Sequence, residues 1–137
     1  MADRIVAPRE RYARWAFTVA GVCGCLVLAP QYFLEREIGL DHPPAITHPE
    51  YFYGFVGIAL AWQIAFVIIA SDPIRFRPLM PAAIVEKLSF AVATSILFGL
   101  GRLGQMLFLA GLLDLMLGIA FAWAYLTTRP QHTQPTT

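Results

Sequence analysis

The chain has 137 residues, of which 58% are hydrophobic and only 14% are charged, and this composition excludes an ordinary soluble domain of its size. A formal net charge of +1 argues against a nucleic-acid partner, because nucleic acids are held by a strongly basic face. We therefore expect the lipid bilayer to surround most of the chain, and four spans of about 20 residues each would leave room for one domain only.

Four apolar stretches predict membrane-spanning helices, at residues 13–33, 51–70, 81–100 and 105–127. Each is long enough to cross the hydrocarbon core as a helix. Buried helices of a soluble protein would keep a charged face, whereas the second and fourth stretches contain segments that are apolar all round. The predicted fold class is all-α: an antiparallel, up-and-down transmembrane four-helix bundle over residues 1–127, with a disordered polar tail at 128–137.

The first span begins with basic residues and so resembles a cleavable signal segment. Residues 27–29 could serve as a cleavage site, but Pro30 directly after them should obstruct a peptidase. We expect the segment to remain as a span. Cys23 and Cys25 would point to nearly opposite faces of this helix, so we expect no disulfide between them.

The loop between the first and second spans is acidic and rich in potential metal ligands. They are Glu35, Glu37, Asp41, His42, His48 and Glu50. Pro43, Pro44 and Pro49 separate these residues without a recognised ligand spacing, so we expect a solvated loop and no metal site. No histidine lies within a predicted span, which argues against a haem held by two histidines, and we predict no cofactor.

The arginines predict the orientation of the chain in its membrane. Seven fall on one side of the four spans, namely Arg4, Arg9, Arg11, Arg14, Arg75, Arg77 and Arg129, and two on the other, namely Arg36 and Arg102. Because basic residues accumulate on the cytoplasmic side, we expect a multi-pass protein of the inner (plasma) membrane with cytoplasmic N and C termini. Arg75 and Arg77 are predicted to contact acidic lipid head groups there.

Polar side chains inside the spans are the candidates for function, because such groups must face protein or water. Gln63 lies near the middle of the second span, and Glu86 and Lys87 lie about one and a half turns into the third. We expect Lys87 to extend to the inner interface. Glu86 shares a helix face with Ser89 and Ala93, and we expect that face to look into the bundle.

Asp114 lies near the middle of the fourth span, where a carboxylate costs several kcal/mol unless it is protonated, paired or hydrated. Gly111, Gly118 and Ala122 share its helix face at spacings of three and four residues. Small residues in such a pattern let another helix approach closely. We therefore predict that this face packs against a neighbouring helix.

Two interpretations of these polar residues remain open. In the first, Glu86, Gln63 and Asp114 form an internal chain that binds a ligand head group, relays a proton or holds an acid for catalysis. In the second, a protonated Asp114 donates a hydrogen bond to Gln63 or to a backbone carbonyl and holds the helices together.

The layout of the chain resembles that of small bacterial four-helix membrane proteins, including DoxX-like and uncharacterised families. The residues that carry the resemblance are the run 49–54 that opens the second helix, Asp72-Pro73 followed by Arg75 and Arg77, Glu86-Lys87, and Asp114 with Gly118. The resemblance covers roughly residues 49–127. It implies a four-helix bundle and no particular activity.

The sequence leads to two main hypotheses of function. The first is a non-catalytic accessory or scaffolding subunit of an inner-membrane complex, with membrane-protein partner subunits or as a homo-oligomer, since no known catalytic motif is present and small-residue faces suit helix association. The alternative is a binding protein or enzyme for a lipid-like molecule, with Asp114, Glu86, Gln63 and Trp62 lining a pocket between helices. A proton or ion pathway is a third option. Whether the chain is an enzyme stays open.

Overall fold

The fold is seen in a computed structural model that describes residues 7–41 and 45–128. The elements are α1 (Pro8–Leu28), η1 (Ala29–Phe33), α2 (Glu35–Asp41), α3 (Pro49–Ser71), η2 (Arg77–Leu79), α4 (Met80–Gly99) and α5 (Gln105–Thr127). No strand occurs in the described ranges. The chain is thus all-α, and its four long helices α1, α3, α4 and α5 are long and apolar enough to cross a membrane.

Proline and glycine set the ends of these helices. Pro8 and Pro49 are the first residues of α1 and α3, where the missing N–H costs nothing and the fixed φ favours the helix. Gly101 follows α4 with a φ of 68°, a conformation that glycine adopts without strain. Its N–H and that of Arg102 donate to the carbonyls of Phe98 and Leu97, both at 2.9 Å, which closes the helix end and turns the chain into α5.

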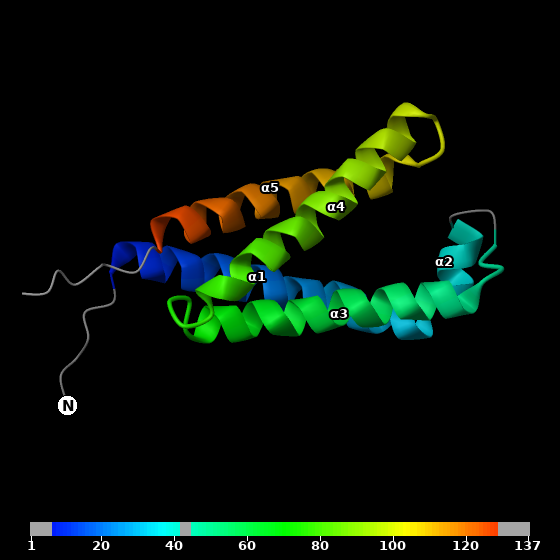
Figure 1. Ribbon diagram of the computed structural model, residues 1–137. Helices are drawn as coiled ribbons and strands as arrows, with labels where there is room; N and C mark the ends of the chain where they lie inside the picture. The colour runs from blue at the N-terminus through cyan, green and yellow to red at the C-terminus, as the bar shows by residue number, and fades with distance from the viewer. Residues whose placement is uncertain (1–6, 42–44, 129–137) are drawn as a thin grey trace, which may run out of the picture.

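The four long helices form two antiparallel pairs. α1 packs against both α3 and α5, and α4 packs mainly against α5, whereas α3 and α4 have little contact. Figure 1 shows the α4–α5 pair diverging from the α1–α3 pair with distance from the loop that joins α3 to α4. We call the end of the bundle that holds Pro8 and Thr127 the terminal end, and the end that holds Gly101 the turn end.

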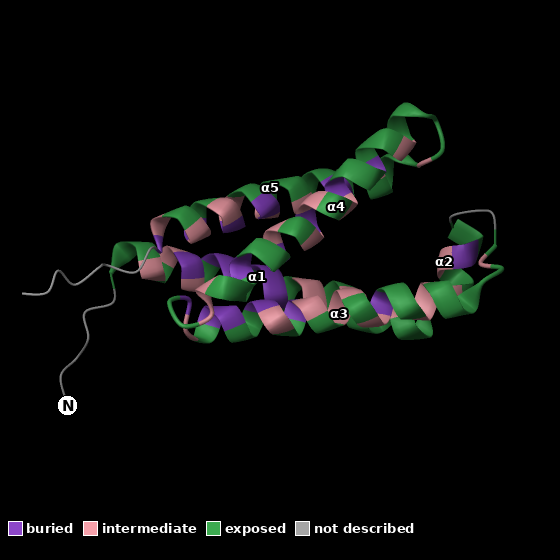
Figure 2. Cartoon of the chain, in the orientation of Figure 1, coloured by how far each residue is buried: buried purple, intermediate pink, exposed green. Residues whose placement is uncertain are grey.

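An aromatic cluster forms the core in the terminal half of the bundle. Phe17 of α1 and Phe121 of α5 stack with ring centroids 4.0 Å apart, and Phe66 of α3 meets the Phe121 ring edge-on at 5.0 Å. All three side chains are fully buried. Figure 2 shows the buried residues of α1 gathered in this half. The cluster therefore joins three of the four long helices at one depth.

Large apolar side chains cover the outside of the bundle. Phe33 is 86% exposed and Met106 is 75% exposed, and similar residues occur on every long helix. An apolar surface of this extent is unsuited to water. It matches the lipid environment that the composition predicts.

Two arginines hold the terminal end together. Arg14 of α1 donates to the carbonyl of Ser71 at 2.6 Å, at the last residue of α3. Arg77 donates to the carbonyl of Tyr125 near the end of α5 at 3.2 Å, and its guanidinium lies 3.9 Å from the centre of that ring. Both cations thus satisfy carbonyls that a helix end leaves unpaired. Arg75 is exposed and is therefore better placed than Arg77 for the predicted contact with acidic lipid head groups. That contact stays a prediction for both residues.

Three local features differ from the sequence predictions. The first helix begins at Pro8 rather than at residue 13, and the short helix α2 was not predicted. Thr128, placed in the polar tail by its sequence, is buried: its hydroxyl donates to the Ala124 carbonyl at 2.7 Å and lies 3.9 Å from the sulfur of Met80. Thr128 therefore belongs to the bundle, and residues 129–137 lie outside the described residues.

Small residues bring α4 and α5 close together. A Cβ added at Gly111 would fall on the Thr94 hydroxyl and lie 2.8 Å from the Thr94 Cβ. A Cβ at Gly118 would lie 3.1 Å from a methyl of Leu88. Ala122, on the same face, is half-buried. The two helices therefore approach to a separation that the glycines make possible.

We expect Gly111→Ala to lower the free energy of unfolding by about 1–3 kcal/mol, because the added methyl overlaps Thr94 and forces the helices apart. The measurement is equilibrium unfolding in mixed detergent micelles. Gly99→Ala is the control, since a Cβ there meets no atom within 4 Å. Adding Thr94→Ala to Gly111→Ala should recover part of the loss; no recovery would show that the two positions are not in contact.

Candidate functional site

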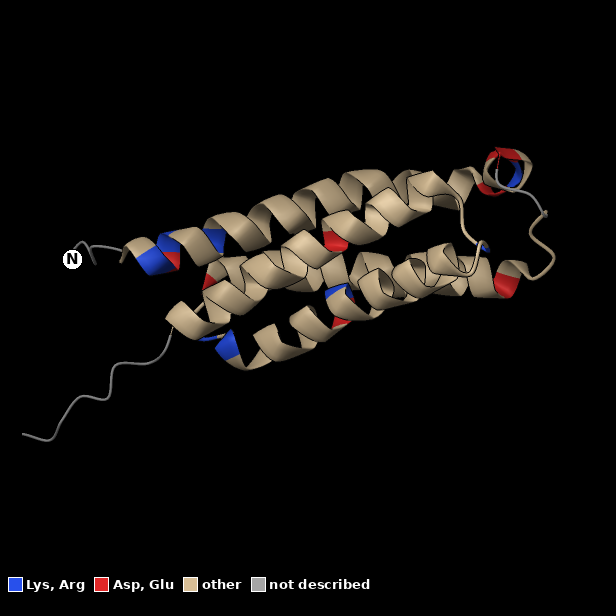
Figure 3. Ribbon diagram, turned by 90° about the horizontal axis from the view of Figure 1, so that it is seen from above, with Lys and Arg blue, Asp and Glu red and all other residues tan. Residues whose placement is uncertain are grey.

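One small group of charged side chains lies midway along the bundle, far from the charges at its two ends (Figure 3). The group consists of Glu86 and Lys87 on α4 and Asp114 on α5. The Lys87 ammonium donates to both Asp114 oxygens, at 3.1 and 3.2 Å. The ammonium also lies 3.4 Å from Glu86 Oε2. We call these three residues the ion cluster.

Lys87 is the most enclosed member of the ion cluster. Its side chain is only 7% exposed, and its ammonium lies 5.3 Å from the centre of the Phe66 ring on α3. The prediction that Lys87 extends to the inner interface is therefore wrong. Ala83 and Ala91, four residues on either side of Lys87, are also buried, so this is the packing face of α4, and Asp114 is the nearby charge that makes burial of an ammonium tolerable.

Asp114 is held in place by the packing of its own helix face. Its side chain is 18% exposed. Gly118, four residues further along α5, lets the stem of Lys87 come close, since a Cβ at Gly118 would lie 3.5 Å from the Lys87 Cβ. The carboxylate therefore accepts two charge-assisted hydrogen bonds in a largely enclosed site.

Glu86 is the incompletely paired member of the ion cluster. Its Oε2 is enclosed by protein but accepts no hydrogen bond within the described part of the chain. The 3.4 Å approach to Lys87 is an ion pair without hydrogen-bond geometry. The side chain is 18% exposed, so the rest of it reaches the surface of α4.

Gln63 does not join the ion cluster. Its amide donates to the Ala59 carbonyl one turn earlier on α3, at 3.0 Å. Its side chain packs on α1 at Gly24, where an added Cβ would lie 2.8 Å from the Gln63 Cγ. Trp62 is half-buried beside Phe66, with ring centroids 6.2 Å apart. The structure therefore does not form the predicted chain from Glu86 through Gln63 to Asp114. Instead, Lys87 lies between the carboxylates of Glu86 and Asp114.

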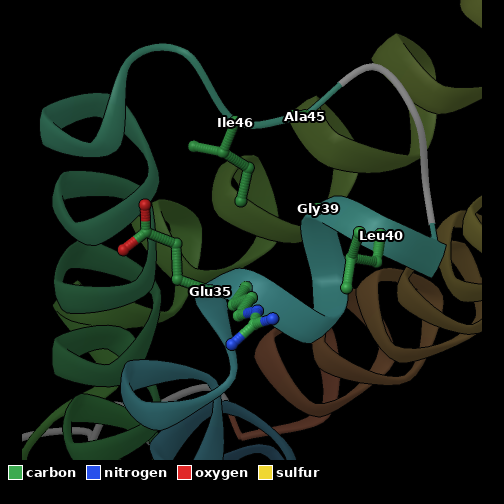
Figure 4. Close-up of a pocket in the computed structure, with 6 residues that line it drawn as sticks. Glu35, Gly39, Leu40, Ala45 and Ile46 are labelled. Atoms are coloured by element: carbon green, nitrogen blue, oxygen red, sulfur yellow. The ribbon is translucent and has the colours of Figure 1, made fainter.

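Two hollows of the described surface lie at the ends of the bundle, away from the ion cluster. One is lined by Pro8, Arg11, Tyr12 and Trp15. The other, in Figure 4, lies between α2 and the segment that carries Ala45 and Ile46. In this second hollow the Glu35 carboxylate accepts a hydrogen bond from the Tyr53 hydroxyl at 2.8 Å. Neither hollow contains a residue of the predicted site.

Metal-ligating side chains do not gather in the structure. Within residues 7–41 and 45–128, no three His, Cys, Asp or Glu residues lie close enough to hold an ion. Of the two histidines in the predicted outer loop, His48 contacts Glu50 at 3.1 Å, and His42 lies outside the described residues.

Asp114 and Glu86 were named from the sequence as polar residues inside the spans, but the position of Lys87 between them was not predicted. The two helices that carry them are antiparallel neighbours joined by a short turn, and Lys87 and Asp114 lie at similar distances from that turn along the chain. This match of depth, together with opposite charge, was the available signal.

Comparison of the chain with protein-family models, with curated proteins and with solved structures found no match. The resemblance to DoxX-like proteins therefore stays a prediction. The geometry of the chain itself is the basis on which a function can be inferred.

We expect Lys87→Met to destabilise the protein by about 3–5 kcal/mol, because it removes the only ammonium between two enclosed carboxyl groups. Asp114→Asn should cost less, since Glu86 Oε2 is already 3.4 Å from Lys87 Nζ and can accept from it after a small movement. Both variants would be measured by unfolding in mixed micelles, with Ser95→Ala on the exposed side of α4 as a control. Equal losses for the two variants would mean that Glu86 does not support Lys87.

Proposed function

We propose that the chain is a non-catalytic accessory or scaffolding subunit of a complex in the inner (plasma) membrane. The observation that carries this proposal is that Lys87, Asp114 and Gln63, all inside the spans, make their polar contacts with the protein's own helices. Lys87 joins α4 to α5 through Asp114, and Gln63 bonds within α3 while filling the space at Gly24. A catalytic or carrier site would need convergent polar groups facing a pocket, and the two hollows at the ends of the bundle are lined by other residues.

The uneven packing of the bundle also supports the proposal. α3 and α4 follow one another in sequence but have little contact, and their rings meet at Phe55 and Phe90 with centroids 6.3 Å apart. The two helix pairs diverge with distance from the loop that joins α3 to α4 (Figure 1). A bundle whose helices are not packed on every side offers its neighbours in the membrane long apolar helix faces.

The proposed orientation places the terminal end in the cytoplasm. Four arginines of the described chain, Arg9, Arg11, Arg14 and Arg77, belong to helices that begin at this end. The positive-inside tendency supports this assignment. Trp15 and Tyr125 lie in the same region and suit the aromatic belt of a membrane interface.

Native mass spectrometry of the tagged chain, extracted in mild detergent from its own host at natural abundance, tests the proposal. We expect stoichiometric membrane-protein partner chains to remain bound. A partner-free chain that carries a tightly bound lipid-like molecule, and loses it in Asp114→Asn, would contradict the proposal and favour the alternative of a binding protein or enzyme. Retention of partners by Asp114→Asn, with thermal unfolding recorded in parallel, is the expected control.

A further inference from the structure

The charges of the ion cluster do not balance. Two carboxyl groups surround one ammonium, and the hydrogen bonds of that ammonium go to Asp114. The carboxylate of Glu86 accepts no hydrogen bond from residues 7–41 and 45–128: its Oε2 is enclosed beside Lys87, and the side chain as a whole is 18% exposed. The nearby Ser89 hydroxyl donates to the backbone carbonyl of Glu86, not to its carboxylate. With both carboxyl groups ionised, the cluster thus lacks one positive charge, and the carboxylate of Glu86 lacks a hydrogen-bond donor.

The face of α4 around Glu86 is made of small, exposed residues. Ala82, Ser89 and Ala93 lie four residues before, three after and seven after Glu86, and all three are exposed. Phe90, one turn beyond Glu86, contacts Phe55 of α3, so this face borders the side on which α3 and α4 diverge. We call Ala82, Glu86, Ser89 and Ala93 the Glu86 face. Its small side chains would let a further helix approach the carboxylate.

The chemistry of the Glu86 face selects among possible occupants. Lipid tails offer no hydrogen-bond donor, and a carboxylate left against them is costly. A second copy of the chain, packed symmetrically through the same face, would bring Glu86 against Glu86 and add like-charge repulsion. A helix with a cationic side chain at this depth supplies both the missing charge and the missing donors.

We propose that the Glu86 face docks a transmembrane helix of a partner protein that presents a lysine or arginine to Glu86, about 9 Å along α4 from Met80. The proposal rests on the proposed function and names the chemistry of the partner. The added cation would complete an alternating row of two carboxylates and two cations across three helices, and Lys87 would keep its bonds to Asp114.

The experiment uses the full chain in phosphatidylcholine vesicles and a synthetic transmembrane peptide as the probe. The peptide is a Leu-Ala helix of about 20 residues with one arginine at the depth of Glu86, and the matched control peptide has leucine there. Association is measured by energy transfer between labels on the chain and the peptide. We expect the arginine peptide to bind about fivefold more tightly than the leucine peptide.

Three variants test the site itself. Glu86→Gln should remove the preference for arginine, because the carboxylate charge is lost. Ala93→Leu should weaken binding of both peptides, because it fills the Glu86 face. Val92→Leu is the control, since Val92 is also exposed on α4 but points about 120° away from Glu86, and it should bind like the native chain. Helix content and thermal unfolding are recorded for each variant, and Ala93→Leu keeps the test decisive if Glu86→Gln fails to fold.

Equal binding of the two peptides to the native chain would overturn the proposal, as would a preference for arginine that persists in Glu86→Gln. The proposed function fails separately, through the absence of partner chains in native mass spectrometry. Partners that remain bound while the peptides are not distinguished would leave the accessory role standing and remove Glu86 as its docking residue.

Discussion

The pairing of Lys87 with Asp114 is the interaction that most constrains this bundle. In water a salt bridge between two helices contributes little, because both charges can be solvated separately. Within the hydrocarbon core neither charge has that option, so separating α4 from α5 would expose an ammonium and a carboxylate together. The pair therefore fixes the register of α4 on α5, and the contact of Lys87 with Phe66 brings α3 to the same depth.

The rest of the packing reflects the weakness of the hydrophobic effect between helices that are already in lipid. Association there depends on close contact and on polar bonds. Gly111 and Gly118 supply the close contact between α4 and α5, and the stacked rings of Phe17 and Phe121 supply it between α1 and α5. No hydrogen bond joins α3 to α4 in the described chain, the two helices have little contact, and theirs is the side that opens.

The spans could be predicted from sequence because the bilayer imposes a single strong condition: long apolar segments with all backbone groups bonded internally. The side-chain partners were harder to predict, because the depth of a residue in the membrane does not determine the direction in which its side chain points from the helix. Lys87 was assigned to the interface since its stem is long enough to reach it, yet the rotation of α4 turns it toward Asp114. Gln63 lies at a suitable depth for the cluster, but its amide is satisfied by its own helix and its side chain fills the space left by Gly24.

The short turn between α4 and α5 has a consequence for how the chain enters a membrane. A helix that carries Lys87 or Asp114 alone would insert with a penalty of about 2.5–3.5 kcal/mol for each such charge near the centre of a span. Because the two residues lie on neighbouring segments of one helical hairpin, closed at Gly101, they can meet before either reaches the hydrocarbon core. Insertion of α4 and α5 as one unit would thus replace the separate penalties of Lys87 and Asp114 by the smaller cost of their hydrogen-bonded pair, with Glu86 beside it.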